Sequence, residues 1–357
     1  MSFVKTRRTL AILAAAALGA CSDSTAPTID HIDAQAASAK VEPVMAVIAD
    51  EPTIAAFAAL GPVGGLPASA SASVAGAVAR LTQSAARGTW DRSTPLLARS
   101  AARSADVLPI DVRGNTYVYN AETQSYEVAT DRTDAPANGI RVVLYAWDFL
   151  AGVPSSPLTA IGHVDLVDQS NAAENRLNVV LVRTAGNLEL MNYAITHSVS
   201  ASSESFSIAG AATNGVTPVT FTLSGTGNET SATIAFDLSA PSVGFSVHAG
   251  ASVNALTEQA SISTRLGYDG HTLSFDLTLQ PNGMNGEVKF DGMRYATWSM
   301  SYDPETGEGT ALFAKANGQP LTVEELEQIT ALFERALNFD AFWAGLLWPI
   351  GALAPVV

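Results

Sequence analysis

Cysteine is almost absent from this chain, which has Cys21 and no other cysteine among its 357 residues. A single thiol cannot form an intramolecular disulfide, and the chain has no CxxC pair that could hold zinc or run a redox reaction. The stability of the folded body must therefore come from a packed core.

Charged residues are scarce too, at 15% of the chain, against about a quarter in typical soluble proteins. Positive charge is the scarcer sign, with 19 Lys and Arg against 34 Asp and Glu and a formal net charge of −15. Residues 1–20 hold three basic residues and no acid, so loss of that segment would take the net charge to −18. A body this acidic repels phosphate backbones and anionic membrane surfaces. We therefore expect no nucleic-acid partner.

Sequence motifs for catalysis, metal binding or cofactor binding are missing as well. The five histidines form no HExxH pair, and the chain has neither a P-loop nor a GxGxxG turn after a predicted strand. His163 and Asp165 share one side of a predicted strand, but no third metal ligand is evident, so a polar sheet face is the favoured interpretation. Gly244–His248 lacks the second glycine of a nucleophile elbow and is predicted to be a strand.

Carboxylate pairs are a further route to catalysis, and the sequence leaves their geometry open. The aspartates on or next to predicted strands that could meet in space are Asp237, Asp276, Asp291 and Asp303. We assign no catalytic, cofactor-binding or metal-binding residue and expect no cofactor. Enzymatic activity stays open, with a non-catalytic role favoured, because β-sheet enzymes can assemble a site from distant strands.

The strongest signal in the sequence lies in its first twenty-one residues. Three basic residues lead into the apolar run Leu10–Leu18, which is short for a membrane span and ends in small residues. The segment Leu18-Gly19-Ala20-Cys21 follows directly and precedes a polar stretch. This order of features resembles the bacterial lipoprotein signal, the lipobox, in which the cysteine is acylated and becomes the mature N-terminus.

The resemblance has several implications for the location of the protein. It implies a signal peptide over residues 1–20, lipid attachment at Cys21 by acyl chains such as palmitate, and a lipid-anchored place in the cell envelope. Ser22 stands where an Asp would favour retention at the inner membrane, so the resemblance implies the outer membrane, facing either the periplasm or the surface. The alternative is an ordinary secretory signal with an incidental cysteine. The oligomeric state is left open.

The next part of the chain predicts a tether and then a small helical region. Residues 21–43 are polar, lack apolar periodicity and predict a flexible tether. Residues 44–110 predict helices that form either a packed subdomain or a stalk. The clearest helix begins at Asp50-Glu51-Pro52 and carries Ile54, Phe57 and Leu60 on one side. Further helices are predicted around residues 69–87 and after residue 94.

Scattered arginines give this helical region a local positive charge; they are Arg80, Arg87, Arg92, Arg99, Arg103 and Arg113. Two interpretations are open: a docking surface for an acidic partner, or a solvated helix face. Because scattered arginines rarely form a binding patch, we favour the solvated face.

Residues 111–320 predict an antiparallel β domain. The clearest strands alternate large apolar residues with Thr, Ser, Asp or Gly, which gives each one buried face and one wetter face. These segments are Val219–Leu223, Ile234–Leu238, Val243–Val247 and Leu273–Leu279. Tyr117–Tyr119 and Tyr126–Val128 flank a predicted hairpin turn. Ile140–Trp147 is apolar on both faces, which predicts a central strand covered from both sides.

Residues 321–357 predict an amphipathic C-terminal helix that packs on the sheet. Thr322 and Glu325 have the spacing of a capping box, and Leu326, Ile329 and Phe333 follow at helical spacing. The expected fold class is therefore mainly β. It is a large curved antiparallel β-meander, open-barrel or sandwich-like, with N-terminal helices and this C-terminal helix.

These features together predict a membrane-anchored envelope lipoprotein that binds an apolar small molecule or lipid without catalysis. At the level of fold alone, it resembles open-barrel lipoproteins that carry lipid or lipoprotein cargo. A structural or adhesive surface lipoprotein is the alternative, because the Ser- and Thr-rich strand faces with little charge fit that role equally well. An envelope hydrolase is a third hypothesis.

Overall fold

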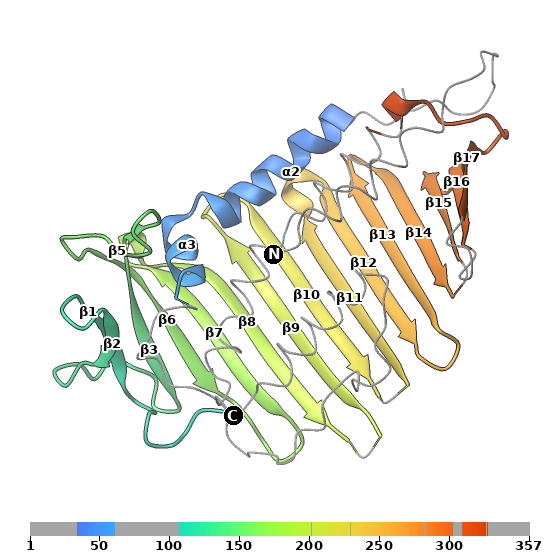
Figure 1. The fold of residues 1–357 in the computed structure, drawn as a ribbon. Coiled ribbons are helices and arrows are strands. Elements are labelled where there is room, and N and C mark those ends of the chain that lie inside the picture. The colour runs from blue at the N-terminus through green and yellow to red at the C-terminus, as the bar shows by residue number, and fades with distance from the viewer. Residues whose placement is uncertain are drawn as a thin grey trace. The chain divides into compact units, whose positions relative to one another are not determined.

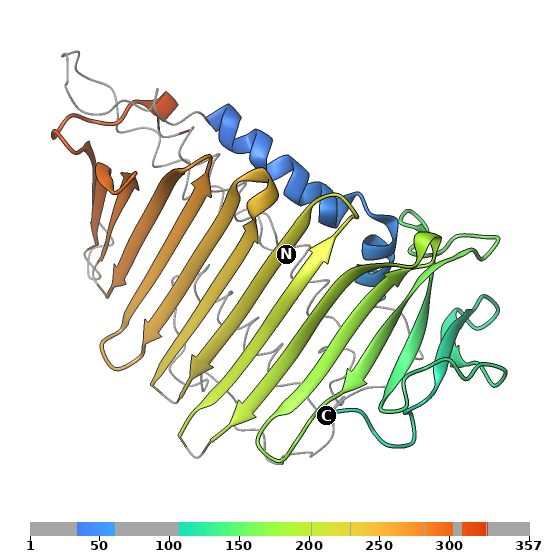
Figure 2. The ribbon, with the colours of Figure 1, turned by 180° about the vertical axis from the view of Figure 1, so that it is seen from behind.

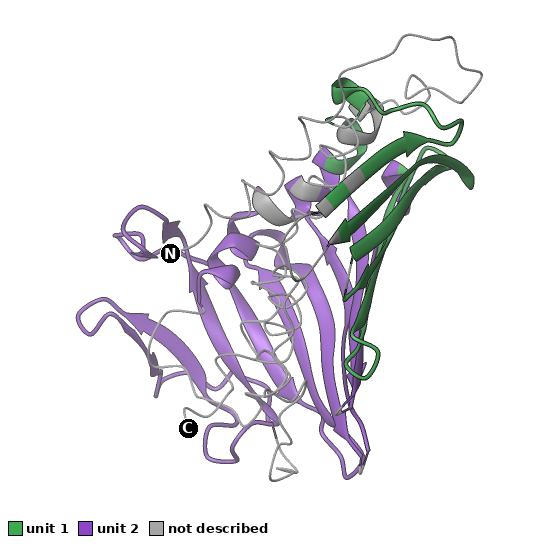
Figure 3. Cartoon of the chain, turned by 45° about the vertical axis from the view of Figure 1, so that its right-hand side comes forward, with its two compact units in different colours: residues 1–41, 244–338 green, residues 42–243, 339–357 purple. Residues whose placement is uncertain are grey.

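The structure is a computed structural model that describes residues 34–60, 107–200, 202–228, 230–281, 283–302, 309–325 and 327. Strands make up 58% of it, so the predicted mainly β class is confirmed. Figures 1 and 2 show the strands from opposite sides. The chain divides into two compact units (Figure 3). Unit 1 comprises residues 1–41 and 244–338, and unit 2 comprises residues 42–243 and 339–357.

The described part of unit 2 is built mainly from one run of neighbouring strands. They are β1 (Thr116–Asn120), β2 (Ser125–Val128), β3 (Gly139–Tyr145), β6 (Ala160–Asp168), β7 (Asn175–Arg183), β8 (Leu188–Val199), β9 (Glu204–Thr213), β10 (Pro218–Gly227) and β11 (Ser231–Ala240). A separate two-stranded ribbon pairs β4 (Trp147–Asp148) with β5 (Val153–Pro154). The 3-10 turns are η3 (Ala185–Asn187) and η4 (Pro241–Val243).

The pairing of these strands follows the predicted meander with one correction. From β6 to β11 each strand pairs antiparallel with the next strand in the chain, and β1 and β2 form the predicted hairpin. The expectation of a purely antiparallel sheet is wrong at β1 and β3, which pair in parallel. The β1–β2 hairpin reverses the chain once and residues 129–138 reverse it again, so β3 runs in the same direction as β1.

The two faces of the unit 2 sheet differ in burial, as the alternating sequence predicts. On β10, Val219, Phe221 and Leu223 are buried, whereas Thr220 between them is exposed. The rings of Phe221 and Tyr193 meet on the buried face with centroids 5.9 Å apart. Strand β3 is buried on both faces over most of its length, as predicted, and helix α3 is one of the elements that pack against it. Apart from β3, the core of unit 2 lies mainly on one face of its sheet.

Helix α3 (Pro52–Ala58) begins where the sequence predicts. Glu51 is its N-cap and accepts a hydrogen bond from the Thr53 N–H at 3.3 Å, with Pro52 at the first helical position. Ile54 and Phe57 are buried, and the helix lies against β3, β6 and β7. The helix thereby covers part of the buried face of unit 2. The helices predicted around residues 69–87 and after residue 94 lie outside the described residues.

Helix α2 (Ala34–Ala49) overturns part of the predicted tether, because residues 34–43 are helical. Alanine has the highest helix propensity and is abundant at the start of this helix. A buried stripe of Val41, Val44 and Val47 crosses the boundary at residue 43 and gives the helix its apolar side. Pro43 lies inside the helix. The rest of the tether lies outside the described residues.

Unit 1 contains the second run of strands. They are β12 (Phe245–Asn254), β13 (Gln259–Tyr268), β14 (His271–Gln280), β15 (Gly283–Phe290), β16 (Met293–Tyr302) and β17 (Gly309–Lys315), each antiparallel to the next. The loops Asp269–Gly270 and Asp291–Gly292 have positive φ at both residues, as two-residue hairpin turns require. Across the described residues, the strands of each unit form an open meander, which favours the open form over a sandwich.

Candidate functional site

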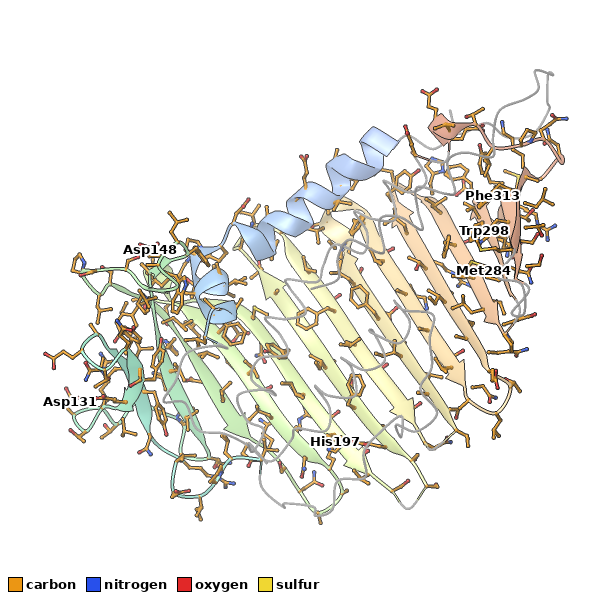
Figure 4. All side chains as sticks on the ribbon, viewed as in Figure 1. Asp131, Asp148, His197, Met284, Trp298 and Phe313 are labelled. Atoms are coloured by element: carbon orange, nitrogen blue, oxygen red, sulfur yellow. The ribbon has the colours of Figure 1, made fainter. Side chains whose placement is uncertain are left out.

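One face of the unit 1 sheet carries a group of aromatic, methionine and leucine side chains, which we call the apolar patch. Its members are Phe275, Leu277 and Leu279 on β14, Met284 on β15, Trp298 and Met300 on β16, and Phe313 on β17. Met284 pairs directly with Leu279 and Met300, and Trp298 pairs with Phe313. Directly paired residues share one face of a sheet. Figure 4 shows Met284, Trp298 and Phe313 gathered on β15–β17.

Trp298 joins the strands of the patch because a glycine makes room for it. The residue opposite Trp298 on β15 is Gly286, and a Cβ added there would lie 2.1 Å from the indole Cζ2. The indole therefore lies over the bare backbone of β15 and reaches Phe275 on β14. The two rings stack with centroids 4.8 Å apart and planes inclined by 29°. An offset stack of this kind adds about 0.5–1.5 kcal/mol to the burial of the rings.

The patch is half-exposed, whereas the same face is closed toward the other end of these strands. All seven patch side chains have intermediate exposure. Leu273, Val288 and Phe290 continue the face and are 0%, 1% and 6% exposed. One apolar surface thus passes from a sealed core into a partly open region rich in methionine and aromatic rings. Methionine side chains are flexible and polarizable, which suits surfaces that adapt to different apolar partners.

A polar anchor closes one end of the patch. The Lys315 Nζ lies 2.6 Å from Glu325 Oε1, and the Tyr295 hydroxyl donates to the same oxygen at 2.9 Å. Tyr295 is the extra residue at a β-bulge, where the register of β16 against β15 shifts. The bulge puts Tyr295 beside Ala296 on the buried side, and both are at most 2% exposed.

The predicted capping box forms part of this anchor. The Glu325 N–H donates to Thr322 Oγ1 at 3.2 Å, and the Thr322 N–H donates to Glu325 Oε2 at 2.8 Å. Glu325 is therefore held by its own helical turn and by Tyr295 and Lys315. The residues that follow it, other than residue 327, lie outside the described residues.

The anchor predicts a dependence of stability on pH. Burial alone raises the pKa of Glu325, but hydrogen bonds from Lys315, the Thr322 N–H and Tyr295 outweigh it, and the pKa lies below the ordinary 4.5. A lowered folded-state pKa stabilises the fold above the unfolded pKa, and this stabilisation is lost as pH falls through the folded value. Wild type should thus be more stable than Glu325→Gln at pH 7, and the difference should shrink below about pH 4.5 in urea denaturation. A gap that stays constant down to pH 3 would contradict the assignment.

His163 and Asp165 lie on the polar face of unit 2, where Arg141 binds the Asp165 carboxylate. Arg141 donates from Nε and Nη2 to the two Asp165 oxygens at 2.7 Å each, and its Nη1 lies 3.1 Å from Asp134. The His163 Nε2 is 3.9 Å from Asp165. Burial, and then the charge of Arg141, lowers the pKa of His163. His163 and Asp165 therefore belong to a polar face of the sheet, which is the interpretation favoured from the sequence. Asp165 forms a bidentate ion pair with Arg141.

Other predicted sites resolve in similar ways. Gly244 has a φ of +66° in the turn before β12, and Ser246 and His248 lie within that strand. The segment is therefore a strand, as predicted, and not a nucleophile elbow. Asp276 lies 3.6 Å from Lys289, and Asp291 contacts His271 at 2.9 Å, so these two aspartates have separate partners. Asp303 and Cys21 lie outside the described residues. Arg113 points to Asp168 and so belongs to an ion pair.

Neither a metal-binding cluster nor a helix able to span a membrane is found among the described residues. No group of three or more His, Cys, Asp or Glu side chains in this part of the chain is placed to hold a metal ion. No helix among these residues is both long and apolar enough to cross a membrane.

The contact between His197 Nε2 and Glu204 Oε1, at 2.6 Å with both side chains about 10% exposed, joins β8 to β9 and was not predicted from the sequence. His197 is labelled in Figure 4.

Comparison with known proteins identifies no similar protein. No protein-family model, no curated protein and no solved structure matches this chain. The apolar patch is therefore the candidate site on its own geometry. Sequence reasoning identified the strand Leu273–Leu279 but missed the patch as a whole. The period-2 spacing of Trp298 and Met300 within one strand is a signal that could have found part of it.

Proposed function

We propose that this chain is a lipoprotein of the cell envelope, anchored at the outer membrane through acylated Cys21, that binds an apolar small molecule or lipid without catalysis. The apolar patch of unit 1 is the proposed binding surface. The observation that carries the proposal is the half-exposed stack of Phe275 and Trp298 beside the Met284–Met300 pair.

The chemistry of the patch supports an apolar ligand over a polar one. Its seven side chains carry one polar atom capable of strong hydrogen bonding, the indole N–H of Trp298. Lys315 and Glu325 lie at the end of the patch, where their charges neutralise each other at 2.6 Å. The ion pairs of Lys289 with Asp276 and of Arg294 with Glu287 involve residues on the opposite face of the same strands. Such a surface gains free energy mainly by removing apolar area from water, at roughly 25 cal/mol per Å².

The second hypothesis, a structural or adhesive surface role, has its own supporting observation. The polar face of unit 2 carries a row of hydroxyl groups across β8–β11, because Ser198, Ser205, Thr226 and Thr233 are paired in register. The hydroxyls of Ser198 and Ser205 lie 2.7 Å apart, and those of Thr226 and Thr233 lie 2.8 Å apart. This face presents hydrogen-bonding groups with little charge to its surroundings.

Native mass spectrometry of the mature protein, extracted gently from its own envelope, tests the apolar-ligand hypothesis. Wild type should carry a bound lipid or other apolar molecule. Trp298→Ala should reduce its affinity about tenfold, which corresponds to about 1.4 kcal/mol, because the indole supplies the largest single contact area. The matched control is Leu312→Ala, which changes an exposed side chain next to Phe313 on the opposite face of β17.

The control should keep the wild-type occupancy. Equal ligand occupancy in wild type and Trp298→Ala would mean that the ligand binds to a surface other than the apolar patch. A clean apo mass for every variant, with the fold intact by circular dichroism, would favour the structural hypothesis.

A further inference from the structure

We propose that two copies of this chain pair with each other along the outer edge of β17, antiparallel, about a two-fold axis between their Leu312 residues. The pairing needs only the backbone of β17 and one exposed side chain, so it stands apart from the proposed function. Three observations on the described residues carry it: the open backbone of β17, the lack of the devices that protect a sheet edge, and a strand sequence that is complementary to itself.

The outer side of β17 has backbone groups that no described strand uses. In the described part of the chain, β17 stands at one end of the strand order and pairs only with β16. The Ala316 N–H donates to the Tyr295 carbonyl oxygen of β16 at 2.9 Å, whereas the Lys315 N–H points away and donates within the turn that follows, at 2.6 Å. Because these directions alternate along a strand, the N–H and C=O groups of Ala311 and Phe313 also point away from β16.

Strand β17 lacks the devices that usually protect a sheet edge, which are charge, proline, a bulge or short length. It runs for seven residues in regular register with β16, and Gly309–Ala314 contains neither a charged residue nor a proline. The strand at the other end of the order, β2, is protected by comparison. It has four residues, and its exposed Glu127 accepts hydrogen bonds from Thr123 and Asn120. The fold therefore blunts one edge and leaves the other able to pair.

The sequence of β17 is complementary to itself when Leu312 lies opposite Leu312 of the second copy. Ala311 and Phe313 then face Phe313 and Ala311 of the other copy, and each of these pairs can exchange both backbone hydrogen bonds. Leu312 is 66% exposed, and the pairing buries two such leucines against each other. Lys315 lies opposite Gly309 of the second copy, which has no side chain to disturb the polar anchor.

This register also explains why the partner is a second copy of the chain. A shift by two residues in either direction would place Leu312 opposite Thr310 or Ala314 and lose the match between the leucines. A two-fold interface uses the same surface on both partners and closes on itself, so the outer edges of both β17 strands are consumed. The assembly therefore stops at a dimer.

Pairing of β17 joins the two apolar patches, and this consequence rests on the proposed function. The two Phe313 residues become diagonal neighbours on one face of the joined sheet, about 7–8 Å apart. Each patch covers four strands, so the joined patches span eight strands, or roughly 34 Å at about 4.8 Å per strand spacing. Such a surface can hold a longer apolar molecule than one patch. Leu312→Ala keeps the backbone of β17 and every patch residue, so it remains a valid control for ligand occupancy.

Oxidative crosslinking of the full chain in its own envelope tests the pairing. Leu312→Cys places two thiols directly opposite each other, about 4.5 Å apart at Cα, which a disulfide can bridge. Thr310→Cys is the matched control, because Thr310 is exposed on the same face but the two copies of it lie about 13 Å apart in this register. We expect Leu312→Cys to form a linked dimer at least about tenfold faster than Thr310→Cys. Peptide mapping separates this disulfide from any bond to Cys21.

A proline at residue 311 tests the backbone bonds themselves. Ala311→Pro removes an outward N–H group from each copy and leaves the bonds to β16 intact, because an edge strand tolerates proline where its N–H faces away from the sheet. The loss of two hydrogen bonds should slow the crosslinking of the Leu312→Cys chain about tenfold. Near-ultraviolet circular dichroism checks that the fold is kept, and the comparison of the two thiols decides the proposal if it is not.

Faster crosslinking at Leu312→Cys than at Thr310→Cys, slowed by Ala311→Pro in a folded chain, supports the dimer. Equal rates for the two thiols, no linked dimer, or an unchanged rate in folded Ala311→Pro overturns it. A disulfide to a different envelope protein assigns the edge to a foreign strand and also overturns it.

Titration with an acyl-chain probe, dansyl undecanoic acid, keeps the pairing and the proposed function apart. Trp298-dependent probe binding without the linked dimer overturns the pairing and leaves the proposed function intact. Specific crosslinking without probe binding supports the pairing and overturns the proposed function.

Discussion

Cys21→Ser is expected to move the protein from the membrane fraction to the soluble fraction without unfolding its body. Each CH₂ group of an acyl chain buried in a bilayer contributes about 0.8 kcal/mol, and one chain alone gives marginal binding, whereas two or more give stable anchoring. The folded body cannot replace this anchor electrostatically, because its net charge is negative. Loss of the proposed acyl anchor should therefore shift almost all of the protein.

The measurement is fractionation of cells that express wild type and Cys21→Ser, with the amount of protein in each fraction followed by immunoblot. Ser24→Ala is the matched control, since it changes a nearby polar residue and leaves the lipobox intact. Near-ultraviolet circular dichroism checks that the variant body keeps its packing. If Cys21→Ser stayed with the membranes at full yield, the lipid anchor at Cys21 would be wrong.

The strands were predictable because their signal is local. In Val219–Leu223 and Leu273–Leu279 the apolar residues alternate with polar ones, and burial in β10 and at the end of β14, from Leu277 onward, follows the same period. Two predicted boundaries are shifted: the strand predicted over Ile140–Trp147 ends at Tyr145, and the one predicted over Val243–Val247 begins later than expected. Gly244 takes a positive φ there after the η4 turn, so β12 begins only at Phe245. The positive φ that glycine allows, and not the apolar pattern, sets the start of this strand.

The start of α2 was missed because its apolar stripe was divided by an assumed boundary. Val41 lay inside the predicted tether, whereas Val44 and Val47 lay in the predicted helical region. A single valine on the tether side of that boundary shows no helical periodicity. The direction of β3 was missed for a different reason, because strand direction depends on how the loop at residues 129–138 returns the chain, and composition does not encode that path.

The candidate site was not predictable as a unit, since it depends on register. Phe275 and Trp298 meet only because β14, β15 and β16 pair as they do and Gly286 lies between them. A shift of one residue in any pairing would send these side chains to opposite faces. The anchor depends in addition on a bulge at Tyr295, which no alternating pattern predicts. Only the capping box of Thr322 and Glu325 was evident from spacing, because its contacts lie within one helical turn.

Asp168→Ala is expected to destabilise unit 2 by about 3–5 kcal/mol, which is the range for breaking a buried ion pair. The Asp168 carboxylate is 2% exposed and lies 3.0 Å from the Arg113 Nη2. It also accepts hydrogen bonds from the backbone N–H groups of Leu108 and Ser170, both at 2.9 Å. Removing it takes the charged partner from the part-buried guanidinium, which keeps its hydrogen bonds to the Leu108 carbonyl oxygen. It also leaves two backbone N–H groups without this acceptor. It also releases residues 107–113 from the end of β6.

Urea denaturation of wild type and variant measures this loss through the midpoint of the unit 2 transition. Glu174→Ala is the matched control, because Glu174 lies in the loop that follows Asp168 and pairs with Arg176 at 4.0 Å, with both side chains well exposed. An exposed pair contributes at most about 1 kcal/mol, so the control should move the midpoint little. Equal shifts for the two variants would mean that Asp168 acts as a surface charge and that the segment at residues 107–113 is held to β6 by its apolar contacts.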